Sequence, residues 1–239
     1  MTGTFFVVAT PIGNLQDITT RAIKTLMSVD AIAAEDTRKT GLLLQNIMAL
    51  NNTNTTNITN NPIRPRLISY YEQNELQRIP EIINALKSGL NIALVSDAGT
   101  PTISDPGFKL VREAIKEGIR VESIPGPSSV ISALVSSGLP TDKFLFIGYP
   151  PKKPGHRKTL FESLTKLPIK TTVILFEGPH HLLRTLGEME GIFGDIDIVV
   201  CRELTKIHEE IRPEKISISI SHFSKSNPKG EFVILFNLF

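Results

Sequence analysis

The run Phe5-Phe6-Val7-Val8-Ala9, followed at once by Thr10-Pro11-Ile12-Gly13-Asn14, sets the pattern that decides the fold. Five successive apolar residues are typical of a strand that is buried on both faces. Thr, Pro, Gly and Asn then predict a loop. A helix is expected to begin near Thr19, and residues 31–34 predict a second short strand, followed by a helix through residues 42–48.

The same alternation continues to about residue 124. Apolar residues recur at helical spacing over residues 79–86, and residues 91–95 predict another buried strand. A helix over residues 108–117 and a strand over residues 121–124 follow. Strands that alternate with helices predict an α/β domain with a mainly parallel sheet, which we place at residues 1–124.

The second half of the chain, residues 125–239, predicts a different α/β domain, with a mixed sheet. Only two clear helices are expected there, over residues 157–167 and 180–189. The expected strands are residues 143–147, 172–176, 197–201, 216–220 and 231–238. The Asn/Thr-rich stretch at 51–65 predicts a flexible insertion, because its polar side chains can bury little apolar surface.

Composition excludes several classes of protein. The 239 residues are 41% hydrophobic, which is ordinary for a globular chain and excludes disorder as a description of the whole. The single Cys201 cannot form an intrachain disulfide, and the five histidines lack zinc-ligand spacing, so no metal is expected. The apolar runs are far shorter than the roughly 20 residues of a membrane helix. These features predict a soluble, cytoplasmic protein.

Four loops follow predicted strands, where ligands of open α/β sheets bind. The alternative is that their Gly, Pro, Ser and Asp residues only form turns. Neither a phosphate-binding loop nor a dinucleotide fingerprint is present, and no Gly-x-Ser-x-Gly elbow marks a hydrolase. The loops are Thr10 to Leu15, Ser96 to Gly107, Pro125 to Ser129 and Glu177 to His181.

Several of these strings resemble the ribosomal RNA small subunit methyltransferase I family, in collinear order over nearly the whole chain. They are Thr10-Pro11-Ile12-Gly13-Asn14-Leu15-Gln16-Asp17-Ile18-Thr19, Ala33-Ala34-Glu35-Asp36-Thr37-Arg38, Leu94-Val95-Ser96-Asp97-Ala98-Gly99-Thr100-Pro101, Ser104-Asp105-Pro106-Gly107, Ile124-Pro125-Gly126-Pro127-Ser128, Arg202-Glu203-Leu204-Thr205-Lys206 and Lys229-Gly230-Glu231-Phe232.

The resemblance implies the tetrapyrrole methylase-like fold, with two α/β domains and S-adenosylmethionine in the cleft between them. It implies methylation of the ribose 2′-hydroxyl of a cytidine in the decoding region of 16S rRNA. The expected partners are 16S rRNA, the 30S subunit and a second copy of the chain, with no membrane or DNA partner. The chain departs from the family pattern at His181, where Arg is usual, in the longer Asn/Thr-rich stretch, and in ending at Phe239 without the extension that many relatives carry.

The resemblance also assigns cofactor contacts. The alternative for Asp97 and Glu177 is a carboxylate that only caps a helix or lies in its first turn. A sulfonium group favours carbonyl and carboxylate oxygens, and Gly-rich loops let the backbone approach a ligand. The residues assigned are Pro11, Ser96, Asp97, Ala98, Gly99, Ile103, Ser128, Ser129, Phe176, Glu177, Leu204 and Gly230.

A ribose hydroxyl needs a base or a hydrogen-bond acceptor before it attacks. The candidate catalytic residues are Asp36, Arg38 and Lys206, and Glu203 is considered beside them. Asp36 could instead cap a helix, and Arg38 could be a solvated residue in the first turn of that helix.

A basic cluster predicts one exposed loop that contacts RNA phosphates, or else a plain solvated loop. Its residues are Lys152, Lys153, Arg157 and Lys158.

Two other functions remain open at this stage. One is a methylase of the same fold that acts on a tetrapyrrole or on a modified protein residue. A macrocycle site would favour aromatic lining, and the chain has no Trp and three Tyr. The other is a ribosome-assembly factor that binds RNA without catalysis.

Overall fold

The computed structural model describes residues 2–53 and 64–238, with the side chains of residues 50–53 left out. Most of the predicted insertion at 51–65 therefore lies outside the described residues. The chain divides into two compact units, Met1–Ser128 and Ser129–Phe239. Each unit contains one five-stranded sheet with helices packed on it, so the predicted α/β class is confirmed.

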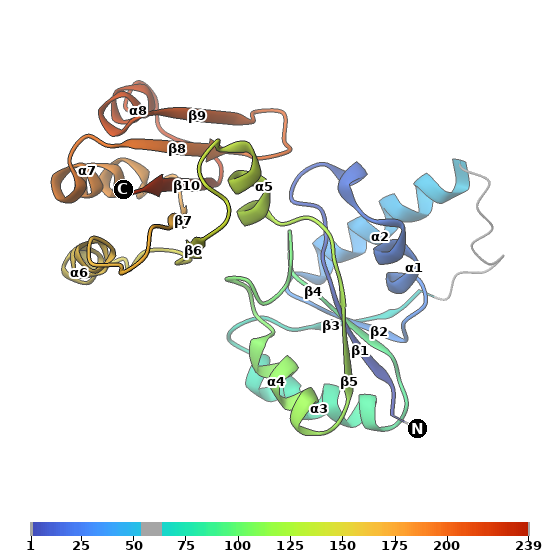
Figure 1. Ribbon diagram of the computed structural model, residues 1–239. Helices are drawn as coiled ribbons and strands as arrows, with labels where there is room; N and C mark the ends of the chain where they lie inside the picture. The colour runs from blue at the N-terminus through green and yellow to red at the C-terminus, as the bar shows by residue number, and fades with distance from the viewer. Residues whose placement is uncertain (1, 54–63, 239) are drawn as a thin grey trace. The chain divides into compact units, whose positions relative to one another are not determined.

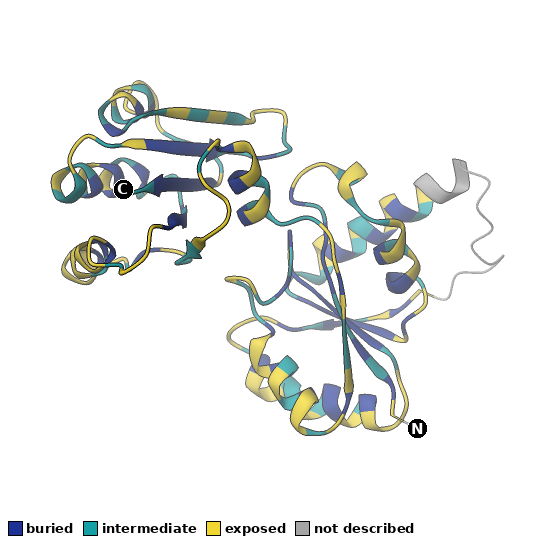
Figure 2. Cartoon of the chain, in the orientation of Figure 1, coloured by how far each residue is buried: buried dark blue, intermediate teal, exposed yellow. Residues whose placement is uncertain are grey.

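The N-terminal unit has a fully parallel sheet in the order β3-β2-β4-β1-β5. Its inner strands β1, β2 and β4 read as short apolar runs because both faces of the sheet are covered, and β2 and β4 are buried throughout (Figure 2). The strands are β1 (Thr4–Val8), β2 (Ala31–Ala34), β3 (Arg66–Ser69), β4 (Ile92–Val95) and β5 (Arg120–Ile124).

Two helices cover each face of this sheet (Figure 1). Leu26 and Ile47 pack with Ile32 and Val95 on the face of α1 (Thr20–Leu26) and α2 (Thr37–Thr53). The opposite face carries α3 (Glu75–Lys87) and α4 (Phe108–Lys116), through residues such as Leu86 and Leu110. The neighbouring strands β1 and β4 therefore lead to helices on opposite faces. In parallel sheets, a crevice at the carboxyl ends of such strands is where ligands bind.

The C-terminal unit has a mixed sheet in the order β6-β7-β10-β8-β9, in which only β6 and β7 run parallel. The strands are β6 (Phe144–Phe146), β7 (Thr172–Glu177), β8 (Asp197–Arg202), β9 (Glu210–Lys215) and β10 (Phe232–Asn237). The helices are α5 (Ser129–Ser136), α6 (Pro154–Leu164), α7 (Leu182–Phe193) and α8 (Ile216–Phe223). One apolar core joins α6, α7 and α8 to the sheet.

The strand predicted at residues 216–220 is wrong, because this segment is the helix α8. Its Ile-Ser-Ile-Ser-Ile alternation suggests a strand, yet Ile216, Ser219 and Phe223 form one buried helical face. Asp195 fixes its start by accepting hydrogen bonds from the Ser217 amide at 2.9 Å and hydroxyl at 2.8 Å. The expectation of only two helices in this half is also wrong, since the described residues include α5 and α8 as well.

Candidate functional site

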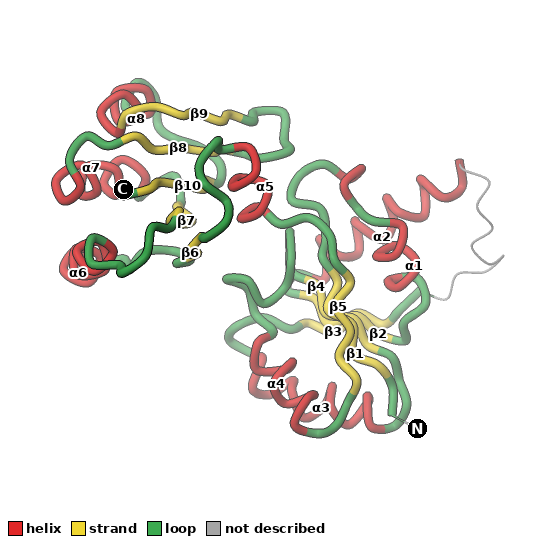
Figure 3. Tube along the Cα trace, in the orientation of Figure 1, coloured by secondary structure: helices red, strands yellow, loops and turns green. Residues whose placement is uncertain are grey.

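Loops lie at the carboxyl edge of the N-terminal sheet (green in Figure 3), and hydrogen bonds join them to one another. The Thr10 amide donates to the Gly99 carbonyl at 2.8 Å, and the Gly99 amide donates back to Thr10 at 3.0 Å. The Thr100 hydroxyl donates to the Pro127 carbonyl at 3.0 Å, which adds the loop after β5. The structure thus brings together the predicted residues Pro11, Ser96, Asp97, Ala98, Gly99 and Ser128.

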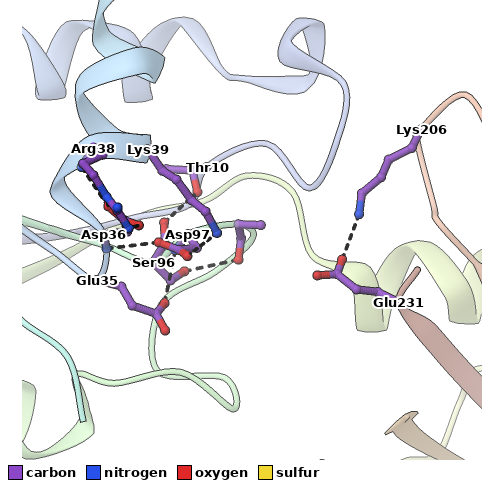
Figure 4. Close-up of polar contacts among 10 residues, drawn as sticks. Thr10, Glu35, Asp36, Arg38, Lys39, Ser96, Asp97, Lys206 and Glu231 are labelled. Carbon is purple, nitrogen blue, oxygen red and sulfur yellow. Dashed lines mark hydrogen bonds and ion pairs between the residues drawn. The ribbon is translucent and has the colours of Figure 1, made fainter. Parts of the chain in front are cut away.

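Asp97 is the centre of a polar network at this edge (Figure 4). Its carboxylate accepts hydrogen bonds from the Asp36 amide at 3.1 Å and from Lys39 Nζ at 2.6 Å. Its own amide donates to Glu35 Oε2 at 3.2 Å. The side chain and main chain of Asp97 therefore fasten the loop after β4 to the segment that joins β2 to α2.

Asp36 caps α2, which is the alternative considered from the sequence. Its Oδ1 accepts from the Arg38 amide at 2.8 Å, and its carboxylate also binds the Arg38 guanidinium at 2.7 and 3.0 Å. These hydrogen bonds hold the pKa of Asp36 well below its usual range. A carboxylate with such a low pKa is a weak base, whereas the Arg38 side chain is 90% exposed and open to a ligand.

Sequence reasoning missed the contribution of Glu35 and Lys39, which lie on either side of the candidate catalytic pair. Burial is the main cause that raises the pKa of the Glu35 carboxyl. The negative charge of Asp97 raises it further, and the hydrogen bond from the Asp97 amide lowers it only in part. The sequence did indicate their position. The string Glu35-Asp36-Thr37-Arg38-Lys39 directly follows strand β2, and residues that follow a parallel strand lie at the carboxyl edge of the sheet, where ligands bind.

We expect Glu35→Gln to change the pH dependence of stability. The folded-state pKa of Glu35 lies above its ordinary value of 4.5, so ionisation disfavours the folded state. As pH rises from about 4.5 through the folded-state pKa, the wild-type protein loses stability that the variant keeps. Denaturant unfolding across pH 4 to 8 should show the variant gaining relative to wild type and then reaching a plateau. A difference that stays constant with pH would contradict this assignment.

In the C-terminal unit, the candidate cofactor residues Phe176 and Glu177 end β7. Glu177 is 6% exposed, and its carboxylate accepts hydrogen bonds from the Gly178 amide at 2.8 Å and the Thr185 hydroxyl at 2.5 Å. Both carboxylate oxygens thus fasten the turn that leads into α7. Phe176 lies edge-on to the rings of Phe146 and Tyr149.

The loop after β8 holds Lys206 between two carboxylates. Lys206 Nζ donates to Glu203 Oε1 and Glu231 Oε2, each at 2.9 Å, and Figure 4 shows the second of these contacts. Burial lowers the pKa of Lys206, but the two hydrogen bonds outweigh burial and raise it above its usual value. Lys206 is therefore a cation at neutral pH, which suits charge stabilisation better than removal of a proton.

Gly230 makes this arrangement possible. A Cβ at Gly230 would lie 2.5 Å from Glu203 Cγ, and the residue has a φ of +98° that favours glycine. Glu203 and Thr205 themselves have positive φ values of 49° and 64°. Left-handed non-glycine residues are uncommon and cluster at functional sites. Leu204, between them, is buried at 8% exposure.

The prediction that four cations share one exposed loop is wrong, because Arg157 and Lys158 lie in helix α6 and Arg157 is buried. Helix α6 begins at Pro154, and Arg157 lies on its buried face with 2% exposure. Its guanidinium donates to both oxygens of Glu188 at 2.6 Å and to the Pro151 carbonyl at 3.2 Å. Lys152, Lys153 and Lys158 are exposed, so only these three are available to a phosphate.

The family model of tetrapyrrole (corrin/porphyrin) methylases matches residues 4–218. Diphthine synthase superposes with a TM-score of 0.67 at 14% identity, covering 97% of this chain and 88% of that one. A uroporphyrin-III C-methyl transferase from Thermus thermophilus, complexed with S-adenosyl homocysteine, gives a TM-score of 0.63 at 13% identity, covering 98% and 97%. At these identities the likeness shows the fold, that of a class III methyltransferase.

The curated relatives are much closer in sequence. A ribosomal RNA small subunit methyltransferase I from Thermotoga maritima is 44% identical over 98% of this chain and 97% of its own length. A protein of the same name from Halalkalibacterium halodurans is 45% identical over 98% of this chain and 75% of its own length. The chain therefore belongs to the tetrapyrrole methylase family and, within it, to the ribosomal RNA small subunit methyltransferase I family. Its cofactor is S-adenosylmethionine.

The donor groups at the N-terminal edge fit this cofactor. Glu35, Asp36 and Asp97 bring three carboxylates to one edge, against the cations Arg38 and Lys39. An excess of negative charge suits a sulfonium cation.

Among the described residues, no group of three or more His, Cys, Asp or Glu side chains could hold a metal ion. Within the described part of the chain, no helix is long and apolar enough to cross a membrane.

Proposed function

We propose that this protein transfers a methyl group from S-adenosylmethionine to the ribose 2′-oxygen of a cytidine in the decoding region of 16S rRNA, in the cytoplasm. The observation that carries the proposal is 44% to 45% identity, over nearly the whole chain, to proteins named for methylation of small-subunit ribosomal RNA. When bound, the cofactor supplies an electrophilic methyl group. The protein's task is then to align the ribose hydroxyl with it.

We propose that S-adenosylmethionine contacts two groups of the predicted residues, one in each unit. In the N-terminal unit, Pro11, Ser96 to Gly99, Ile103 and Ser128 lie on loops from one sheet edge. In the C-terminal unit we propose Ser129, Phe176, Leu204 and Gly230, with Glu177 supporting the turn beside Phe176. The positive φ values of Thr102 and Ser104, 75° and 61°, hold Ile103 out from its loop with 44% exposure.

The candidate catalytic residues take distinct parts. Arg38 is an exposed cation at the carboxyl edge of the N-terminal sheet, where it suits a phosphate or the ribose oxygens of the RNA. Lys206 is a cation held in place by two carboxylates. Asp36 stays ionised and orients Arg38 through two hydrogen bonds to its guanidinium.

A labelling assay tests the proposed substrate class. Purified protein is incubated with tritiated S-adenosylmethionine and either 30S subunits, a tetrapyrrole or total ribosomal protein. The proposal expects label in the RNA of the 30S subunit and none in the other two. Label in the tetrapyrrole or in protein would favour the alternative activity of this fold. RNA binding without label would favour a non-catalytic assembly factor.

We predict that Lys152→Glu, Lys153→Glu and Lys158→Glu together reduce methylation of 30S subunits by more than tenfold. Each lost phosphate contact should lower the slope of log affinity against log salt by about 0.7 to 0.9. Cofactor affinity, measured by calorimetry, should not change. Lys166→Glu, an exposed charge reversal beyond the end of the same helix, is the control. A triple variant with wild-type activity and salt slope would show that these lysines are solvated surface.

We also predict a homodimer, as the resemblance implies. Sedimentation equilibrium at micromolar concentration should give about twice the 26.4 kDa mass of the chain. A mass of one chain across that concentration range would refute the dimer without affecting the proposed reaction.

A further inference from the structure

A cavity of about 230 Å³ lies beside Asp97 in the N-terminal unit and is not explained by the network described above. Its walls come from the loop after β1, the short helix η1 (Leu15–Asp17), the first half of α2 and the loop after β4. Pro11, Leu15, Leu42 and Leu43 supply apolar surface. Lys39, Asn46 and Asp97 supply polar groups.

The size of the cavity points to a fragment rather than to the whole cofactor. Pockets that enclose a drug-sized ligand are about 300 to 1,000 Å³. The present cavity is smaller. It is also open to solvent, and the lining residue Leu42 is 58% exposed. A single planar ring with apolar side chains beside it suits such a space, and unstacked bases of single-stranded RNA are what proteins bind in sequence-specific recognition.

Two exposed cations lie beside the cavity, and each is paired with a carboxylate, Arg38 with Asp36 and Lys39 with Asp97. The side chains of Arg38 and Lys39 are 90% and 63% exposed, and both extend from the first turn of α2. They would attract the phosphates on either side of a base.

Asn46 supplies a group that can read a base. It lies three and four residues after Leu43 and Leu42, and so on the same face of α2. Its side-chain amide offers one acceptor and two donors, and the residue is exposed, so these groups are accessible to a ligand. Cytosine presents an amino donor next to a ring-nitrogen acceptor, which an amide can match with two hydrogen bonds.

We propose that this cavity binds the base of the target cytidine, with Leu42 and Leu43 against the ring, Asn46 on its hydrogen-bonding edge and Arg38 and Lys39 near the adjoining phosphates. The inference rests on the proposed function. Because Pro11, Ser96 and Asp97 belong both to the cavity wall and to the predicted cofactor contacts, a base bound here would place its ribose next to the cofactor. In-line methyl transfer requires that proximity.

Asn46→Ala is the principal test, with Gln45→Ala as the matched control. Gln45 is the neighbouring exposed amide on α2 and does not line the cavity. We expect Asn46→Ala to lower kcat/KM for 30S subunits by about tenfold, which is the scale of one or two lost hydrogen bonds. The dissociation constant for S-adenosylmethionine should stay within twofold, and Gln45→Ala should match wild type in both measurements.

A second measurement separates base recognition from a structural effect. Subunits are reconstituted with uridine in place of the target cytidine. Wild type should prefer cytidine, and Asn46→Ala should lose most of that preference. The inference is overturned if Asn46→Ala weakens cofactor binding instead, if it leaves kcat/KM unchanged, or if the base preference survives. If wild type itself labels no RNA, the proposed function fails first, and that result is visible without any variant.

Discussion

Asp97→Lys should abolish binding of S-adenosylmethionine while the protein stays folded. The change replaces a carboxylate with an ammonium group beside Lys39, at the edge of the sheet where three carboxylates now gather. Two unit charges about 4 Å apart interact by about 4 kcal/mol at an effective dielectric constant near 20, so reversing one of them costs several orders of magnitude in affinity. Calorimetry measures the binding, and circular dichroism checks the fold.

Asp97→Asn serves as the comparison. It keeps the shape and one acceptor oxygen, so it removes the charge while keeping one of the two hydrogen bonds that Asp97 accepts from the Asp36 amide and Lys39. We expect weakened but measurable binding. Wild-type affinity in a folded Asp97→Lys variant would remove Asp97 from the cofactor site.

Arg157→Met should destabilise the C-terminal unit by about 3 kcal/mol or more. Removing one partner of a buried ion pair typically costs about 3 to 5 kcal/mol, and the 26% exposure of the Glu188 side chain places this pair at the lower end of that range. Here Glu188 would lose two hydrogen bonds of 2.6 Å and keep a contact with Arg184 at 3.2 Å. Urea unfolding followed by circular dichroism measures the loss.

The double variant Arg157→Met with Glu188→Met tests the cause. Replacing both partners with apolar side chains is often nearly neutral, so the double variant should recover most of the lost stability. If the single variant unfolds at the wild-type midpoint, the ion pair does not stabilise this unit. A double variant no more stable than the single one would point to lost packing of the Arg157 stem instead.

The central strands were the most predictable part of the fold. Residues 31–34 are apolar throughout because they are buried on both faces, and the strand there has the predicted bounds. Edge strands were harder. β9 reads Glu-Ile-Arg-Pro-Glu-Lys, since a strand at the edge of a sheet can carry charges and a proline. β3, at the edge of the other sheet, has four residues and no strong apolar run.

The candidate site was predictable as a set of loops but not as a set of contacts. Parallel strands bring their carboxyl ends to one edge, which is why Pro11 and Ser96 to Gly99 meet. The partners of Asp97 lie 58 to 62 residues away in sequence, and no local pattern pairs them. Arg157 did carry a signal. With Phe161 and Leu164 it forms an i, i+4, i+7 stripe, which places it on the buried face of its helix.

The most direct test of the central claim locates the transferred methyl group on the RNA. Purified protein is incubated with labelled S-adenosylmethionine and 30S subunits, and the extracted 16S rRNA is hydrolysed with alkali. A 2′-O-methyl group blocks cleavage at its own nucleotide, so the account predicts that all the label remains in one alkali-resistant dinucleotide that begins with a cytidine of the decoding region. Label released in mononucleotides, as methylation of a base would give, would contradict it.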